Sequence, residues 1–295
     1  MSVKKRERFK RNTIAIVYDF DGTLTQQPMQ EYTVLPQIKI NPDKFWNKVK
    51  AEKMSTKGEE IVTYMRLMLE LADQNKFSIN KESLGSLAHK IKFYPGVTTY
   101  FNRINHYVRK KTKGKIHLKH YIISAGLKEI LQKVKIEKHF SNIFASEYYY
   151  DHHGVAKFPL IIVNDTLKTQ FLFRINKGKE GHAENINEHM PLSARPIPFP
   201  NILYIGDGLT DVPCMTVTTK QGGYAIAVYK PGSKKGLATC KKLLGAGRVE
   251  LIAKANYRNK SDLDFAIKSI LDTMIQGIRI NSLYFSQYLK YLRKK

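Results

Sequence analysis

The sequence has little cysteine. Only Cys214 and Cys240 occur among 295 residues, and their separation does not match that of a metal-binding cysteine pair. Neither a disulfide framework nor a cysteine-based zinc site is supported. We expect both thiols to be buried as small apolar side chains.

Long hydrophobic runs are also missing. Apolar stretches such as IVTYMRLMLELA, from Ile61, are interrupted by Arg66 and Glu70 and fall short of the roughly 20 residues that a membrane-spanning helix needs. The basic start MSVKKRERFKRN is not followed by the apolar region and cleavage site of a signal peptide. We therefore predict no membrane span and a cytoplasmic protein.

Acidic residues are scarce relative to basic ones. The sequence has 25 Asp and Glu against 50 Lys and Arg, which gives a net charge of +25. Such a charge attracts anions, whether phosphorylated metabolites, nucleic acid or a membrane surface. The basic residues are spread along the chain without a nucleic-acid-binding motif, so we do not favour nucleic acid or an anionic surface as the partner.

Predicted strands alternate with predicted helices along most of the chain. This alternation indicates an α/β fold with a doubly wound, mostly parallel sheet, in which ligands bind beyond the carboxyl ends of the strands. The strands are predicted at residues 13–18, 120–124, 201–206, 224–229 and 249–253, and helices at 97–110, 127–134, 165–177 and after Pro231.

Residues 28–95 have a different pattern. Three helices are predicted there, from Asn41 to Lys53, from after Gly58 to Asp73, and from Asn80 to Lys92, with no strand between them. We expect an all-helical cap domain at 28–95, inserted into a catalytic core made of 1–27 and 96–295. Trp46, Tyr64 and Met68 are expected to pack inside this insert rather than contact a substrate.

Two further segments have recognisable patterns. Aromatic and β-branched residues around DHHG, from Asp151, predict a short strand and a hairpin. A helix is predicted from Ser261, with apolar positions at helical spacing through Ile278 and on to Leu292. We expect this helix to pack against its own domain, with a membrane-surface or partner helix as the alternative.

The run DFDGTLT follows the first predicted strand. Asp19 and Asp21 are two residues apart, so an extended chain places both carboxylates on one side and turns Phe20 into the core. One carboxylate could attack phosphorus while the other handles the proton of the leaving group. An ordinary Asp-Gly turn is the alternative.

A second acidic run, GDGLTD, follows the strand that ends at Gly206. It adds Asp207 and Asp211, and four converging carboxylates would repel one another unless a divalent cation neutralised them. Hard oxygen ligands favour Mg²⁺. Alternatively, these aspartates cap the next helix, as Asp211 before Pro213 is placed to do.

Two polar positions are candidates for binding phosphate. Ser124 ends a strand just before Ala125 and Gly126, so its hydroxyl and nearby N–H groups could hold phosphate oxygens, or it could cap a helix. Lys168 lies in the first turn of a predicted helix, where the helix dipole opposes a cation, whereas Lys177 lies in the last turn, where the dipole favours one. We therefore prefer Lys168.

Together these motifs resemble the haloacid dehalogenase superfamily, in particular its phosphoserine-phosphatase-like branch with a helical C1-type cap. The resemblance implies that Asp19 forms an aspartyl-phosphate and that Asp21 is the general acid and then base. It implies phosphate binding by Ser124, Lys168, Ala125 and Gly126, Mg²⁺ binding by Asp19, Asp207 and the carbonyl of Asp21, and support from Asp211 and Thr23.

The resulting expectation is a Mg²⁺-dependent phosphohydrolase of a small phosphomonoester, whose specificity depends on the insert. A phosphotransferase or phosphomutase would use the same chemistry. The alternative from another class is a non-catalytic anion- or nucleic-acid-binding protein on the same fold.

Overall fold

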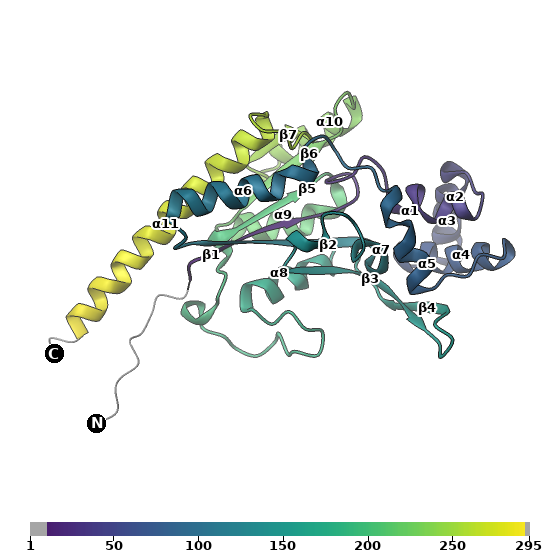
Figure 1. Cartoon of the computed structure of the whole chain (residues 1–295), viewed down its shortest axis with the longest axis horizontal. Helices are drawn as coiled ribbons and strands as arrows, with labels where there is room; N and C mark the ends of the chain where they lie inside the picture. The colour runs from purple at the N-terminus through teal and green to yellow at the C-terminus, as the bar shows by residue number, and fades with distance from the viewer. Residues whose placement is uncertain (1–10, 293–295) are drawn as a thin grey trace.

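The computed structural model describes residues 11–292, and its centre is a seven-stranded sheet in the order β4-β3-β2-β1-β5-β6-β7 (Figure 1). All neighbouring strands are parallel except β4, which pairs antiparallel with β3. The predicted mostly parallel α/β sheet is confirmed. The strands are β1 (Thr13–Tyr18), β2 (His117–Leu127), β3 (Asn142–Tyr150), β4 (Ala156–Ile161), β5 (Ile202–Gly206), β6 (Tyr224–Tyr229) and β7 (Leu251–Lys254).

Apolar side chains of β1 enter two different cores. Ile14 and Ile16 belong to one buried cluster and Ala15 and Val17 to the other, because alternate residues of a strand face opposite sides of the sheet. Both faces are covered by helices, which explains the continuous apolar run TIAIVY. The sheet is therefore doubly wound.

Five longer helices supply the covering layers. One cluster includes apolar residues of α6 (Val97–Thr112) and α11 (Asp262–Leu292). The other includes those of α8 (Lys168–Lys177), α9 (Val212–Lys220) and α10 (Lys234–Gly245), together with the buried, free thiols of Cys214 and Cys240. The short α7 (Lys128–Leu131) follows a β2 that is longer than predicted.

The insert after β1 is helical, as predicted, but has two additional short helices. Four-residue helices are too short to show a periodic pattern, which is why the sequence did not indicate α1 and α2. The third predicted helix ends early and continues as a 3-10 turn, Leu87–Lys90. The insert contains α1 (Met29–Tyr32), α2 (Val34–Gln37), α3 (Pro42–Thr56), α4 (Glu60–Gln74) and α5 (Lys81–Ser86).

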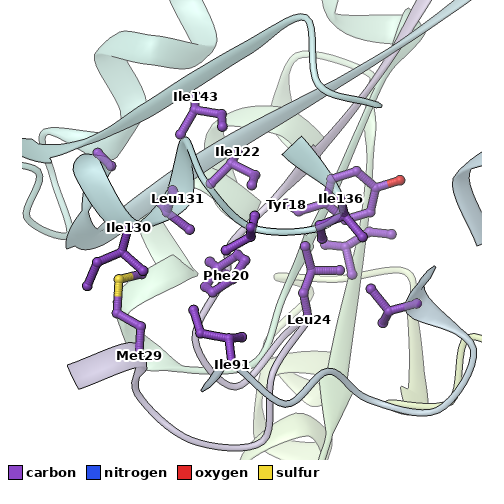
Figure 2. Close-up of a cluster of buried hydrophobic side chains, with 14 of the residues drawn as sticks. Tyr18, Phe20, Leu24, Met29, Ile91, Ile122, Ile130, Leu131, Ile136 and Ile143 are labelled. Atoms are coloured by element: carbon purple, nitrogen blue, oxygen red, sulfur yellow. The ribbon is translucent and has the colours of Figure 1, made fainter. Parts of the chain in front are cut away.

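An apolar cluster joins the loop after β1 to its neighbours. Figure 2 shows Phe20 and Leu24 of this loop beside Met29 and Ile91 of the insert, with Ile130 of α7 nearby. Phe20 is fully buried, as predicted. The loop that contains Asp19 and Asp21 is therefore anchored on both sides by packed side chains.

The hairpin around Asp151 is present, since β3 and β4 pair there. Oδ1 of Asp151 accepts hydrogen bonds from the backbone N–H groups of His153 and Val155 at 2.9 and 3.0 Å. Such bonds are typical of an Asp-initiated turn. The turn is therefore built by Asp151.

The C-terminal helix packs against its own domain over only half of its length. Leu263 to Ile278 supply a buried face, but Ile280, Leu283 and Tyr284 are 66%, 65% and 70% exposed. At about 1.5 Å per residue the helix spans about 46 Å, and Figure 1 shows it running past the sheet. The expectation of packing was wrong for the outer half. Within the described residues no helix meets the length and hydropathy that a membrane span requires.

Candidate functional site

Three polar segments meet because β1 lies between β2 and β5. Tyr18, the last residue of β1, aligns with Ile122 of β2 and Ile205 of β5. The backbone N–H of Asp19 donates to the carbonyl of Ile205 at 2.9 Å. Parallel strands thus bring the residues that follow them to the same edge of the sheet.

Lys168 reaches this edge from the first turn of α8. Its Nζ lies 2.8 Å from Oδ1 of Asp19 and 2.8 Å from Oδ1 of Asp211, and the side chain is 2% exposed. Burial lowers the pKa of Lys168, but the carboxylates of Asp19 and Asp211 outweigh burial and raise it well above the usual value. Lys168 is therefore a fixed cation beside Asp19.

Lys177 has a different role. Its Nζ donates to the backbone carbonyls of Ile186 and Glu188, the latter at 2.8 Å. It therefore fastens the loop after α8 and does not contact Asp19. Of the two lysines, only Lys168 lies at the edge of the sheet.

Asp211 organises its neighbours through hydrogen bonds. Oδ1 accepts from the hydroxyl of Tyr204 at 2.7 Å as well as from Lys168, and Oδ2 accepts from the backbone N–H of Asp207 at 3.1 Å. Asp211 is fully buried and makes no side-chain cap at the start of α9. The capping alternative for Asp211 is therefore wrong.

Tyr204 was not singled out in the sequence. The sequence does contain an indication of its role, because the hydroxyl of Tyr204 in the otherwise apolar strand ILYIG needs a buried hydrogen-bond partner. Its partner is Asp211 at 2.7 Å.

Two glycines let the acidic loops approach one another. A Cβ on Gly22, which has φ +82°, would lie 2.2 Å from Oδ2 of Asp207, and a Cβ on Gly206 would lie 2.3 Å from Oδ2 of Asp211. Neither position has room for a side chain, and Gly22 adopts a backbone conformation that other residues rarely take. Glycine at these positions is therefore required by the site.

Carboxylates of Asp19, Asp207 and Asp211 gather within 4.8 Å of one another. Burial, and then the charge of Asp19, raises the pKa of Asp207 well above the usual value. Burial also raises the pKa of Asp19 to about 6, although Lys168 opposes the shift. One lysine does not balance three carboxylates, so the donor set suits a hard divalent cation.

Asp21 faces a different direction from this cluster. Its Oδ1 accepts a hydrogen bond from the backbone N–H of Met29 at 2.8 Å, so the carboxylate is tied to the first helix of the insert. Burial, followed by the charge of Asp19, raises the pKa of Asp21 well above the usual value. Asp21 therefore holds a proton more readily than an exposed aspartate does.

Ser124 ends up beside the carboxylates but does not cap a helix. Its Oγ accepts from the N–H of Gly126 at 3.0 Å, and α7 has no side-chain cap. The capping alternative for Ser124 is therefore wrong. The N–H of Gly126 is already paired, whereas the carbonyl of Ala125 accepts from the hydroxyl of Tyr64 at 2.7 Å.

α8 begins at Lys168, three residues after the start at residue 165 that the sequence predicts. Neither Asp165 nor Thr166 caps it; instead Oδ1 of Asn164 accepts from the backbone N–H of Leu167 at 2.9 Å. This turn brings Lys168 to the first helical position. Asn164 is thus a positioning residue that the sequence did not single out.

Thr23 is fully buried in the loop after Asp21. Its carbonyl accepts a hydrogen bond from the hydroxyl of Tyr257 at 2.9 Å, while its Oγ1 has no partner among the described residues. Thr23 therefore fixes the loop through its backbone.

A cavity of about 460 Å³ opens onto these residues. Asp19, Asp21, Ser124 and Lys168 line its floor, and its other wall comes from α3, the residues before α4, and α4 itself. Trp46 and Tyr64 line it as well as packing in the insert, so the expectation that they only pack was incomplete. The insert therefore forms part of the cavity. Its lining from the insert side includes Trp46, Lys53, Glu59, Glu60, Ile61 and Tyr64.

Comparison with known proteins agrees with this geometry. The model of the haloacid dehalogenase-like hydrolase family matches residues 16–216. An uncharacterized protein of Borreliella burgdorferi (strain B31) is 30% identical in an alignment of 278 residues that covers 86% of this chain and 95% of that protein.

Solved structures share the fold at low sequence identity. A HAD family hydrolase from Salmonella enterica serovar Typhi has a TM-score of 0.55 and 19% identity, with 84% of this chain and 69% of that chain covered. A phospho-aspartyl intermediate analogue of phosphoserine phosphatase has a TM-score of 0.54 and 16% identity, with 88% and 99% covered. Because the family model covers more than half of the chain, the protein belongs to the haloacid dehalogenase-like hydrolases.

Proposed function

We propose that the protein is a Mg²⁺-dependent phosphohydrolase that cleaves a small phosphomonoester through an aspartyl-phosphate on Asp19. The observation that carries this proposal is the buried Lys168, whose Nζ lies 2.8 Å from both Asp19 and Asp211. A cation held against a carboxylate in the lining of a cavity is suited to an anionic substrate. The solved phosphoserine phosphatases support the proposal through their fold.

Asp19, Asp207 and the backbone carbonyl of Asp21 would hold the metal. Asp211 would support it, since its oxygens already accept from Lys168, Tyr204 and the N–H of Asp207. When bound, Mg²⁺ would offset the negative charge of the carboxylates and of the phosphoryl oxygens.

In the first step an oxygen of Asp19 attacks phosphorus, the bond from phosphorus to the ester oxygen breaks, and Asp21 donates a proton to the leaving alcohol. The raised pKa of Asp21, caused first by burial, suits a general acid. In the second step water attacks the phosphorus of the aspartyl-phosphate and Asp21 accepts its proton. The bond between phosphorus and Asp19 breaks, and inorganic phosphate leaves.

Lys168 and Ser124 would bind the phosphoryl oxygens during both steps. Lys168 lies against Asp19, so it can offset charge that develops on the oxygens around phosphorus. Ser124 lines the same cavity, and rotation of its side chain about the Cα–Cβ bond would move Oγ and release the N–H of Gly126 for the phosphate. The N–H of Ala125 is the further donor expected there.

Residues 28–95 would act as a cap that sets specificity. They form one wall of the cavity, and Tyr64 links α4 to the backbone of Ala125. A wall built by an inserted helical unit can exclude water and select the alcohol of the ester.

A Mg²⁺-dependent assay with an aryl phosphate tests the proposal. The wild type should release aryl alcohol, and Asp19→Asn should lose almost all of this activity. Asp43→Asn, on the exposed start of α3, is the matched control and should stay active. Absence of activity in the wild type would refute the phosphohydrolase proposal, and equal activity in Asp19→Asn would refute the assignment of Asp19 as the nucleophile.

The same assay separates hydrolysis from transfer. With glycerol present, release of inorganic phosphate and aryl alcohol in equal amounts supports hydrolysis. A deficit of inorganic phosphate would indicate transfer to the alcohol instead. An acid-quenched reaction should contain a peptide phosphorylated at Asp19, which supports the covalent step.

A further inference from the structure

The outer half of α11 carries an exposed apolar stripe. Ile280, Leu283, Tyr284, Tyr288 and Leu292 are 66%, 65%, 70%, 49% and 48% exposed. Ile280, Tyr284, Tyr288 and Leu292 are four residues apart and Leu283 is three residues after Ile280, so the five side chains occupy about one half of the helix surface. Large exposed apolar patches in proteins mark interaction surfaces.

A cationic groove lies beside this stripe. It has a volume of about 560 Å³ and runs between α11 and the end of α6. Ile116, Ile278 and Leu283 supply its apolar lining, while Lys113, Lys115 and Arg279 supply positive charge. Lys111 also lines it but is paired with Asp272.

Acidic residues are few around the groove and the stripe. Asp272, which is paired with Lys111, is followed in the sequence by no further Asp or Glu, whereas Arg279, Lys290 and the final Arg-Lys-Lys are all basic. Within residues 11–292, Lys113 and Lys115 take part in none of the ion pairs. The surface therefore combines unpaired cations with exposed aliphatic and aromatic side chains.

We propose that the groove and the outer stripe of α11 are a docking site for an anionic phospholipid membrane. The stripe would enter the boundary between headgroups and acyl chains, where tyrosine is favoured. Lys113, Lys115 and Arg279 would contact lipid phosphates, with their aliphatic stems along the apolar lining.

Two other occupants fit this surface less well. Nucleic acid offers phosphates but nothing that would cover the aliphatic Ile280 and Leu283. A second copy of the chain would bring Arg279 and Lys290 against like charges, with no acidic side chain on the outer helix to offset them.

The catalytic cavity would remain open to solution in this arrangement. In Figure 1 the insert helices α1 to α5 and the outer end of α11 lie at opposite ends of the long axis. The proposal therefore stands independently of the phosphohydrolase proposal.

Vesicle flotation of the full chain tests the docking site. Binding should be strong to phosphatidylcholine vesicles that contain phosphatidylserine and weak to phosphatidylcholine alone. Charge reversal by Lys113→Glu with Lys115→Glu should weaken binding at least about tenfold. Lys241→Glu with Lys242→Glu, two exposed lysines on α10, is the matched control.

A second pair of variants tests the apolar stripe. Ile280→Ser with Leu283→Ser should weaken binding by at least about tenfold, because burial of their side chains is lost. Phe265→Ser, which replaces a 73% exposed side chain on the inner half of α11, should bind as the wild type does. Thermal unfolding checks that each variant is folded.

Three results would overturn the proposal. The first is equal binding to both kinds of vesicle, or binding to neither. The second is a loss of binding in the control variants equal to that in the test variants. The third is binding to double-stranded DNA that the Lys113→Glu and Lys115→Glu substitutions weaken, with no binding to vesicles.

Discussion

Nζ of Lys168 lies 2.8 Å from Oδ1 of Asp19, and both side chains are almost completely buried. The same nitrogen lies 2.8 Å from Asp211. One lysine thus joins the proposed nucleophile to the residue that organises the second acidic loop, which explains why a cation is tolerated at the start of α8 against the helix dipole.

Replacement of this lysine should damage both activity and stability. We expect Lys168→Met to lower turnover of an aryl phosphate by about 10²-fold or more and to destabilise the metal-free protein by about 3–5 kcal/mol, because two buried carboxylates lose their partner. Kinetics and urea unfolding measure the two effects. Lys177→Met, which loosens only the loop after α8, is the matched control. Similar turnover in both variants would contradict the assignment.

Magnesium should stabilise the folded protein through Asp207. At about 100 times its dissociation constant, a ligand that binds only the folded state adds about 2.7 kcal/mol. Thermal unfolding of the wild type should therefore shift upward with Mg²⁺, and Asp207→Asn should lose most of the shift.

Asp165→Asn, at the rim of the cavity, is the control for this measurement. Without metal, Asp207→Asn should be at least as stable as the wild type, since one of three mutually repelling carboxylates is removed. An unchanged Mg²⁺ shift in Asp207→Asn would exclude this carboxylate as a ligand.

Tyr64 should couple the insert to the catalytic core. Tyr64→Phe removes the hydrogen bond from the hydroxyl of Tyr64 to the carbonyl of Ala125. That carbonyl still accepts a hydrogen bond from the hydroxyl of Ser146 at 3.2 Å. We expect a loss of about 1 kcal/mol in unfolding free energy and a raised KM for the aryl phosphate. Tyr149→Phe, at a 44% exposed ring, should change neither. An unchanged KM in Tyr64→Phe would argue against this coupling.

His120 should make stability depend on pH. The ring is 1% exposed and lies between the hydroxyl of Tyr18 and Oδ1 of Asn105, at 3.0 and 3.2 Å. Burial, and then the charge of His139, lowers the pKa of His120 to about 3. The unfolded chain has a pKa of about 6.5 at this residue, so between these values only the unfolded state binds the proton.

The contribution of His120 to stability should therefore fall as the pH falls below about 6.5, by about 1.4 kcal/mol at about pH 5.5, whereas the raised pKa of Asp19 acts in the opposite direction. Urea unfolding at about pH 7.5 and pH 5.5 measures the net change in stability, and the difference between the wild type and His120→Gln isolates the loss that His120 causes. The same pH dependence in the variant would show that another group is responsible.

The sequence determined the elements that hold the site. A continuous apolar run such as TIAIVY predicts a strand that is buried on both faces, and strands that alternate with helices predict a parallel sheet. The two acidic runs follow such strands, so their meeting at one edge of the sheet was predictable from sequence.

Tertiary structure decided what depends on packing between distant segments. It brings Lys168 into contact with Asp19, whereas Lys177 binds the loop after α8. The position of each lysine in the helix only favoured Lys168, and the turn at Asn164 is what places it at the site. Tertiary structure also pairs Tyr204 with Asp211, since the partner of a buried hydroxyl depends on the loop folded over it.

The C-terminal helix shows the same division. Its sequence determined that residues up to Leu292 are helical and apolar in pattern. Only the tertiary structure shows that the rest of the domain stops covering the helix near Ile278. Apolar side chains of α11 are therefore buried before that residue and exposed after it. Local sequence sets the conformation of the backbone, but the extent of the neighbouring sheet and of α6 sets which surface is removed from water.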